Sequence, residues 1–86
     1  MLGGHDGAVV AIGVVRVWRR DDGWGVVDAE ETPGGCWVHV SAVRASVHRE
    51  LRAGQQVRFA FEAVQQDGYD YRAEWAEVLD EGRPGA

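Results

Sequence analysis

The chain has no lysine, one cysteine and two prolines, and it contains no apolar run of membrane length. A single cysteine excludes an intramolecular disulfide framework, so we expect Cys36 to be a small buried hydrophobic residue. The lack of a membrane-length run, and of a basic segment followed by an apolar leader, favours a soluble cytoplasmic protein. The 86 residues suffice for one domain, whose small core must use nearly every apolar strand position.

Basic residues are also scarce, and this limits the possible partners. Fourteen acidic residues against nine basic ones give a formal net charge of −5 and a pI near 5.0. Such a chain repels polyanions at long range, so any binding of nucleic acid must be local. Because every basic residue is arginine, each can stack on a base as well as pair with a phosphate. Arg16, Arg19 and Arg20 precede the most aromatic segment. They either hold phosphates or simply pair with Asp21 and Asp22.

The apolar pattern predicts an all-β domain without internal repeats. Alternation and β-branched residues predict strands over residues 10–19, 24–28, 36–40, 57–62 and 71–79. An Asp67-Gly68 turn joins the last two strands, and a long connection with a short helical turn separates the third from the fourth. We therefore predict a five-stranded antiparallel Greek-key barrel, the oligonucleotide-binding fold, over residues 10–79. Residues 1–9 are expected to be a flexible leader and residues 80–86 a disordered tail.

Two of the predicted strands carry aromatic residues with a period of two. Alternation over residues 22–27 and 36–40 sends one set of side chains to the same outer face, and these are Trp24, Val26, Trp37 and His39. Aromatic planes beside arginines are what unpaired bases need for stacking. The alternative is that both tryptophans are partly buried at a strand crossing and that His39 is an ordinary exposed strand residue. We predict a nucleic-acid-binding surface.

Other aromatic residues lie outside this set. Trp18 alternates with Arg16, but a β-bulge would turn it over, so contact with a ligand and burial in the core both remain open. Trp75 is expected to pack against the side of the barrel. Tyr69 and Tyr71 are expected to decorate the last turn, unless the turn brings one phenol to the rim of the surface.

Four segments, in order and spacing, resemble a cold-shock domain of the bacterial type, of which the chain would be a divergent acidic member. They are GVVRVW at 13–18, GWGVV at 23–27, WVHVSAV at 37–43 and LRAGQQV at 51–57. The resemblance covers residues 12–79, and the second and third segments resemble the family's two ribonucleoprotein motifs. It implies a barrel that binds single-stranded RNA or DNA and acts as an RNA chaperone, transcription regulator or antiterminator.

The resemblance also implies which positions stack bases, namely Val17, Trp24, Val26, Trp37, His39, Val40 and His48. Three of them are valines where the family usually has aromatic residues, and Asp22 occupies the position of a family lysine. At about 1–3 kcal/mol per stacked base, these losses predict weakened binding. The candidate nucleic-acid-binding residues are Arg16, Trp18, Arg19, Trp24, Val26, Trp37, His39 and His48.

We do not expect an enzyme, a cofactor or a metal. Cys36 and His39 have the spacing of a metal-binding pair, but an odd separation in a strand sends them to opposite faces. Ser41 near His39 lacks an acid to complete a catalytic triad. The predicted partner is single-stranded RNA or DNA, and the chain is expected to be monomeric. The alternative is a protein-docking module whose acidic surface or Trp75 binds a basic component of the transcription or translation machinery.

Overall fold

The strands of this computed structural model follow the predicted pattern closely. Residues 9–45 and 49–79 are described, so the expected leader and tail lie outside the described residues except for Val9, which begins the first strand. The elements are β1 (Val9–Arg19), β2 (Trp24–Asp28), β3 (Cys36–His39), the 3-10 turn η2 (Val40–Ala42), β4 (Gln56–Glu62) and β5 (Tyr71–Val78). Val40, predicted in the third strand, instead opens η2, because Nδ1 of His39 accepts the backbone N–H of Ser41 and caps this turn. The described part of the chain contains no helix able to cross a membrane.

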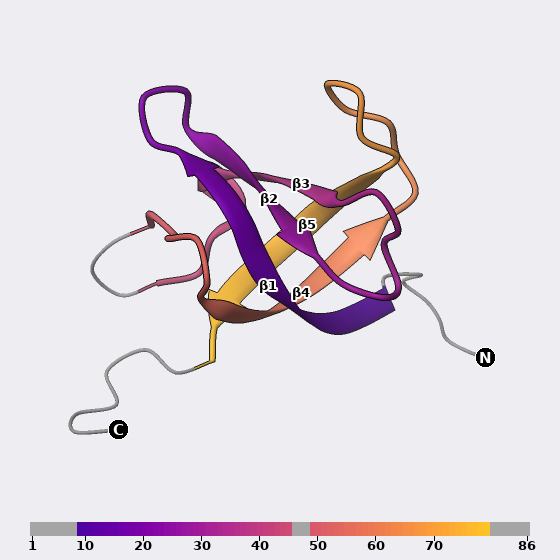
Figure 1. Cartoon of the computed structure of the whole chain (residues 1–86), viewed down its shortest axis with the longest axis horizontal. Helices are drawn as coiled ribbons and strands as arrows, with labels where there is room; N and C mark the ends of the chain where they lie inside the picture. Colours follow the sequence, from indigo (N-terminus) through magenta and orange to yellow (C-terminus); the bar gives the residue numbers. More distant parts are fainter. Residues whose placement is uncertain (1–8, 46–48, 80–86) are drawn as a thin grey trace.

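The strands close into a barrel in the order β1-β2-β3-β5-β4, which confirms the predicted five-stranded β-barrel (Figure 1). β1 runs antiparallel to β2 and β4, β2 is antiparallel to β3, and β4 is antiparallel to β5. The remaining pair, β3 with β5, is parallel. This parallel pair was not predicted, but it follows from the topology: directions cannot alternate all the way around a ring with an odd number of strands.

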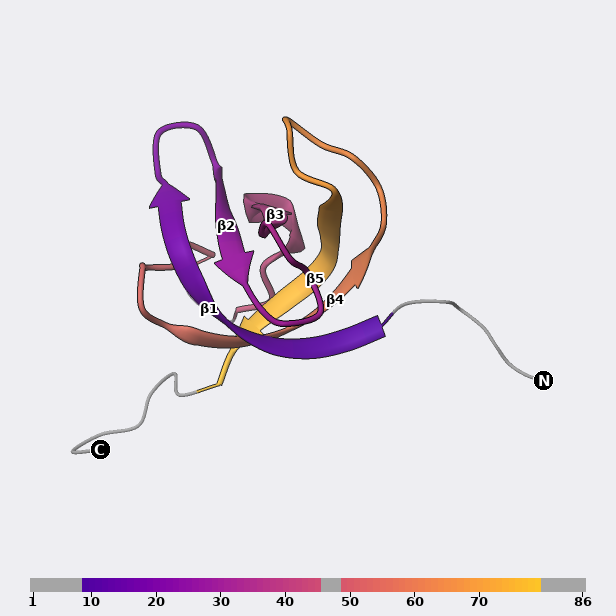
Figure 2. The ribbon, with the colours of Figure 1, turned by 45° about the vertical axis from the view of Figure 1, so that its right-hand side comes forward.

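β1 is long enough to belong to both sides of the barrel. Its first half pairs with β4 from Val9 to Val14, and its second half pairs with β2 from Val14 to Arg19 (Figure 2). The register shifts between Val15 and Val17, which is the β-bulge that the sequence left open. After the bulge, the alternation of inward and outward side chains along β1 is reversed, and Trp18 faces inward.

The core consists of inward side chains from all five strands. The most deeply buried of them include Val15, Val27, Cys36, Val38, Val57 and Phe59. Burial raises the pKa of the free Cys36 thiol to about 12, so the thiol is protonated at neutral pH, as expected of a core residue. Val26 and Trp37 are also buried but do not belong to this core cluster. Alternation along β2 and β3 places them on the outer face of the barrel.

Two loops project from the same end of the barrel, the β1–β2 turn and the β4–β5 connection (Figures 1 and 2). In the second loop Asp67 and Gly68 have φ angles of 52° and 91°. Two consecutive positive φ angles are typical of a type I′ turn, and reciprocal backbone hydrogen bonds of 2.9 Å between Gln66 and Tyr69 close it. The predicted Asp-Gly turn is thus confirmed, and it fixes the position of Tyr69.

Candidate nucleic-acid interface

Three aromatic side chains form a continuous row on the outer face of β2 and β3. Trp24 pairs with His39, and Val26 pairs with Trp37, in the antiparallel register of these strands. The ring centroids of Trp24 and Trp37 are 6.1 Å apart with an interplanar angle of 30°. Those of Trp37 and His39 are 5.7 Å apart with an angle of 33°. The register therefore brings together the three rings that the sequence placed on one face, and we call them the aromatic row.

The three rings differ in their exposure to solvent. His39 is exposed and Trp24 is half-buried, whereas Trp37 between them is only 8% exposed. The Nε1 group of Trp37 is buried and has no hydrogen-bond partner among the described residues. Arg72 is the neighbour of Trp37 on the parallel strand β5. The open ring surfaces are thus those of Trp24 and His39, and Trp37 lies between them as a buried support.

His39 is held by its own turn. Its Nδ1 accepts the backbone N–H of Ser41 at 3.1 Å and lies 2.8 Å from the Ser41 hydroxyl. Because a backbone amide only donates, Nδ1 carries no proton in this arrangement, and the neutral ring has its proton on Nε2. The imidazole therefore has a fixed orientation and keeps one free donor.

Trp24 is bordered by a cation and by a second aromatic ring. The guanidinium carbon of Arg19 lies 5.5 Å from the centroid of the Trp24 ring, within the range of a cation–π interaction. The ring of Tyr69 meets Trp24 edge-on with centroids 6.5 Å apart. From the sequence, Tyr69 was expected mainly to decorate the turn. The adjacent Asp67-Gly68 turn is the signal that could have predicted its position beside Trp24. Tyr71 instead packs edge-on against Phe61, 5.7 Å away, and belongs to the barrel wall.

Two of the predicted site residues lie differently from the aromatic row, Val26 and Trp18. Val26 is on the outer face but is fully buried, because Val17 and Trp37 flank it on the neighbouring strands and Gly35 lies against its Cγ1. Trp18 is turned inward by the bulge and packs against the core. Val26 therefore offers no surface to a ligand in this structure, whereas Trp18 is partly buried against the core.

Arg16 is engaged by a carboxylate. It donates through Nε and Nη2 to both oxygens of Asp28 at 2.6–3.1 Å, and through Nη2 to the carbonyl of Gly34 at 3.1 Å. Hydrogen bonding from Arg16 lowers the pKa of Asp28 below its ordinary value of 3.8, so the carboxylate stays charged at neutral pH. The expected role of Arg16 as a phosphate partner would therefore require it to leave Asp28.

Other arginines near the aromatic row are paired in the same way. Arg20 contacts Glu50 at 3.1 Å, and Arg72 contacts Glu62 at 3.2 Å. Among residues 9–45 and 49–79, Arg19 forms no ion pair, which makes it the most available cation beside the row. His48, the last predicted site residue, lies outside the described residues.

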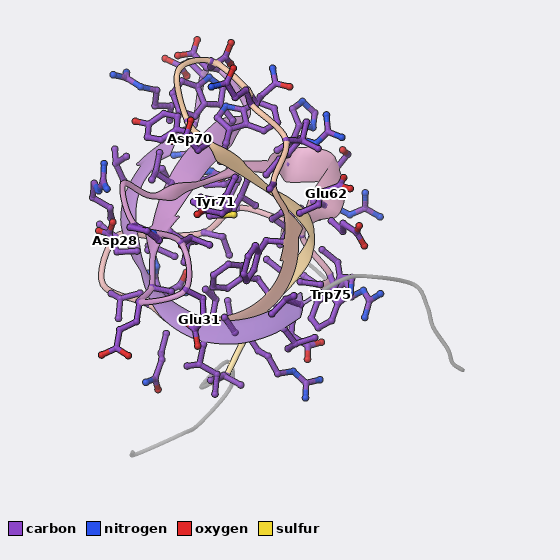
Figure 3. The ribbon with its side chains drawn as sticks, turned by 90° about the vertical axis from the view of Figure 1, so that its right-hand side faces the viewer. Asp28, Glu31, Glu62, Asp70, Tyr71 and Trp75 are labelled. Carbon is purple, nitrogen blue, oxygen red and sulfur yellow. The ribbon has the colours of Figure 1, made fainter. Side chains whose placement is uncertain are left out.

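An open hollow of about 440 Å³ adjoins the row. Trp37, His39, Ser41 and Ala42 line one side, and Glu62, Arg72, Ala73 and Glu74 line the other. Glu62 lies on the side of η2, away from Asp28 and Glu31 (Figure 3). Within the described ranges, no group of three or more His, Cys, Asp or Glu side chains is arranged to hold a metal ion. The rim of the hollow thus combines donors and carboxylates rather than a purely basic surface.

Comparison with known families decides the assignment. Residues 11–72 match the family model of the 'Cold-shock' DNA-binding domain. The chain belongs to the cold-shock domain family. The match covers β1 from Ala11 onward, all of β2 to β4, the start of β5 and the whole aromatic row. The family resemblance seen in the sequence is thus confirmed, and the domain has a nucleic-acid-binding fold. Comparison with curated proteins gave no match. Where this cold-shock domain has valine instead of the family's aromatic residues, Val17 and Val40 are half-buried and Val26 is fully buried.

Proposed function

We propose that this cold-shock domain binds single-stranded RNA or DNA by stacking unpaired bases on Trp24 and His39, with Trp37 supporting both rings. The observation that carries the proposal is the continuity of the row, in which each ring lies within 6.1 Å of the next. Stacking on aromatic planes is tolerant of sequence, because every base has a π face. Tyr69 adds an edge to the Trp24 end of this surface.

Electrostatic attraction contributes little to this binding. Arg19 is beside Trp24, but Asp21 and Asp22 follow it in the turn and are exposed. If one or two phosphates are neutralised, the logarithm of the affinity falls with the logarithm of salt concentration with a slope of about −1 for a single strand. We expect micromolar affinity that depends mainly on stacking.

The cellular role that follows is that of an RNA chaperone or antiterminator acting in the cytoplasm. A protein that binds unpaired strands and not duplexes lowers the population of hairpins by mass action. Weak and sequence-tolerant binding suits this task, because the strand must be released again for translation or further folding.

A second candidate function is protein docking on the same fold. The pairing of Arg16, Arg20 and Arg72 with carboxylates favours it, because these cations are then not available for phosphates. The partner in that case would be a basic component of the transcription or translation machinery.

Replacement of single tryptophans separates the two functions. Trp24→Ala removes a stacking surface and is expected to weaken binding to oligo-dT by about 5- to 150-fold, the equivalent of one stacked base. The binding is measured by fluorescence anisotropy of a labelled oligonucleotide at low salt. Trp75→Ala is the matched control, since Trp75 contacts Arg44 and Arg58 rather than the aromatic row. Equal affinities of the two variants would exclude stacking on the row, and no binding by the unmodified protein would favour docking.

A further inference from the structure

Exposed large hydrophobic side chains occur on one part of the molecule. In the described part of the chain they are Val9, Val10, Ile12, Val14 and Leu79, each between 40% and 54% exposed. The first four lie in the N-terminal half of β1, and Leu79 directly follows β5. Such residues scattered singly need no explanation, but a contiguous set marks an interaction surface.

The strand register makes Val10, Ile12, Val14 and Leu79 contiguous across three strands, whereas Val9 pairs with the core residue Phe61 and lies on the other face of β1. Ala60 of β4 pairs with both Val10 and Trp75, and Arg58 pairs with both Ile12 and Glu77. Gln56 pairs with Val14, and its carbonyl accepts the backbone N–H of Leu79 at 2.9 Å. We call this surface the β4 face; its outward side chains are Val10, Ile12, Val14, Gln56, Arg58, Trp75, Glu77 and Leu79.

The β4 face lies on the opposite side of the barrel from the aromatic row. In the ring order, β4 is flanked by β1 and β5, whereas the row lies on β2 and β3 (Figure 1). The nucleic-acid interface therefore does not account for the exposed apolar side chains. The exposed apolar side chains of β1 point out of the sheet rather than along its edge, so a partner that covers them packs face to face.

We propose that the β4 face is the interface of a homodimer, in which a second copy of this chain packs on it about a two-fold axis. The charges favour this occupant. Nε of Arg58 donates to Glu77 at 3.0 Å in the middle of the face, and the Arg44 guanidinium lies 4.1 Å from the Trp75 ring at its side. The acids of this face are thus balanced, although the chain as a whole has a net charge of −5. Two copies that meet here bring together balanced charges rather than an excess of acid.

The central ion pair also makes the β4 face self-complementary. A two-fold axis between Arg58 and Glu77 brings Arg58 of each copy toward Glu77 of the other copy, as an isologous interface requires. The apolar side chains of β1 then cover one another. Both aromatic rows remain on the outside of the dimer, so that a long strand can engage two binding surfaces with increased avidity.

The first test is the mass of the full chain in solution without nucleic acid. Sedimentation or light scattering over about 10 µM to 1 mM should show the mass rising from 9.4 kDa toward twice that value, as expected for a micromolar dimer. Ile12→Lys places a charge in the apolar part of the β4 face and should keep the protein monomeric. Gln65→Lys, with the same change of charge in the β4–β5 loop, should dimerise like the unmodified chain. A mass that stays at 9.4 kDa at every concentration means that no second copy binds, and the proposal is then wrong.

A charge-swap experiment tests the two-fold geometry. Arg58→Glu makes the centre of the face acidic, and Glu77→Arg makes it basic, so neither variant should associate with itself. A mixture of the two should form a heterodimer at concentrations where each alone is monomeric. If the mixture stays monomeric while the unmodified protein dimerises, the copies do not meet through this ion pair, and the β4 face is not the interface. Oligonucleotide binding is not part of this readout, so the outcome is independent of the proposed function.

Discussion

Gly25 of β2 lies directly against Trp18, its partner on β1. A Cβ at this position would lie 2.4 Å from Cε3 of Trp18 and 2.4 Å from the carbonyl oxygen of Val17. No side chain fits there while the indole of Trp18 stays beneath β2. Packing against Trp18 thus requires glycine at the position next to Trp24. The same packing holds β2, and with it the aromatic row, in place.

Gly25→Ala is expected to lower the free energy of unfolding by about 1–3 kcal/mol, the usual cost of overpacking. Urea unfolding monitored by circular dichroism measures the effect. Trp18→Leu removes the clashing ring but not the contact with the Val17 carbonyl oxygen, so in the double variant the alanine should cost less than in the single one and still destabilise the fold, which a double-mutant cycle reveals as partial coupling. Strictly additive effects of the two substitutions would show that Trp18 is not the group that excludes a side chain at position 25.

At the scale of residues, the sequence predicts which face of a strand a side chain lies on better than it predicts how exposed that side chain is. Period-two alternation correctly put Trp24, Trp37 and His39 on one face. It could not show that Trp37 is nearly buried or that Val26 is fully buried, because their neighbours come from other strands. Burial of an outward residue depends on the register of the adjacent strands, and a single strand carries no information about that register.

At the scale of elements, the bulge in β1 ties three segments together. It directs Arg16 to Asp28 at the end of β2 and to the carbonyl of Gly34 in the following loop. This ion pair is about half exposed, with side-chain exposures of 43% and 50%. Exposed pairs contribute up to about 1 kcal/mol, so this one positions the loop rather than supporting the fold as a whole.

The Arg16–Asp28 pair should give a small pH dependence of stability. The pKa of Asp28 is lowered in the folded state, so the stabilisation is present above the ordinary carboxyl value of 3.8 and is lost as the pH falls through the lower folded value. Asp28→Asn should cost up to about 1 kcal/mol at neutral pH, and its difference from the unmodified protein should shrink in acid. Urea midpoints at neutral pH and near pH 3 measure this, with Glu30→Gln as the control for an exposed neighbouring acid. A difference that stays constant with pH would contradict the assigned ion pair.

The sequence predicted the turns between these elements, but it did not predict which side chains the turns bring together. The Asp67-Gly68 turn was expected and is present, because only residues that tolerate positive φ fit its centre. That this turn sets Tyr69 against Trp24 follows from the position of the β4–β5 loop relative to β2. Such a relation between distant segments is a property of the closed barrel.

At the scale of the whole molecule, ring closure divides the surface into two sides. The aromatic row is on β2 and β3, and the apolar β4 face is opposite. The five strands and the family could be predicted from turns, alternation and motifs. The exposed side chains of β1 were not expected, since the small core was predicted to use nearly every apolar strand position. The structure covers only one side of this strand, and for this reason we propose a dimer where the sequence analysis predicted a monomer.

The central claim is that the aromatic row binds unpaired bases, and a tryptophan-fluorescence titration with oligo-dT and oligo-rU tests it most directly. We predict saturable quenching at low salt that is largely absent in Trp24→Ala, with an affinity that falls with salt at a slope of about −1 on logarithmic axes. Absence of quenching by either oligonucleotide at low salt would contradict the claim. The barrel would then be a cold-shock fold whose aromatic row does not bind bases.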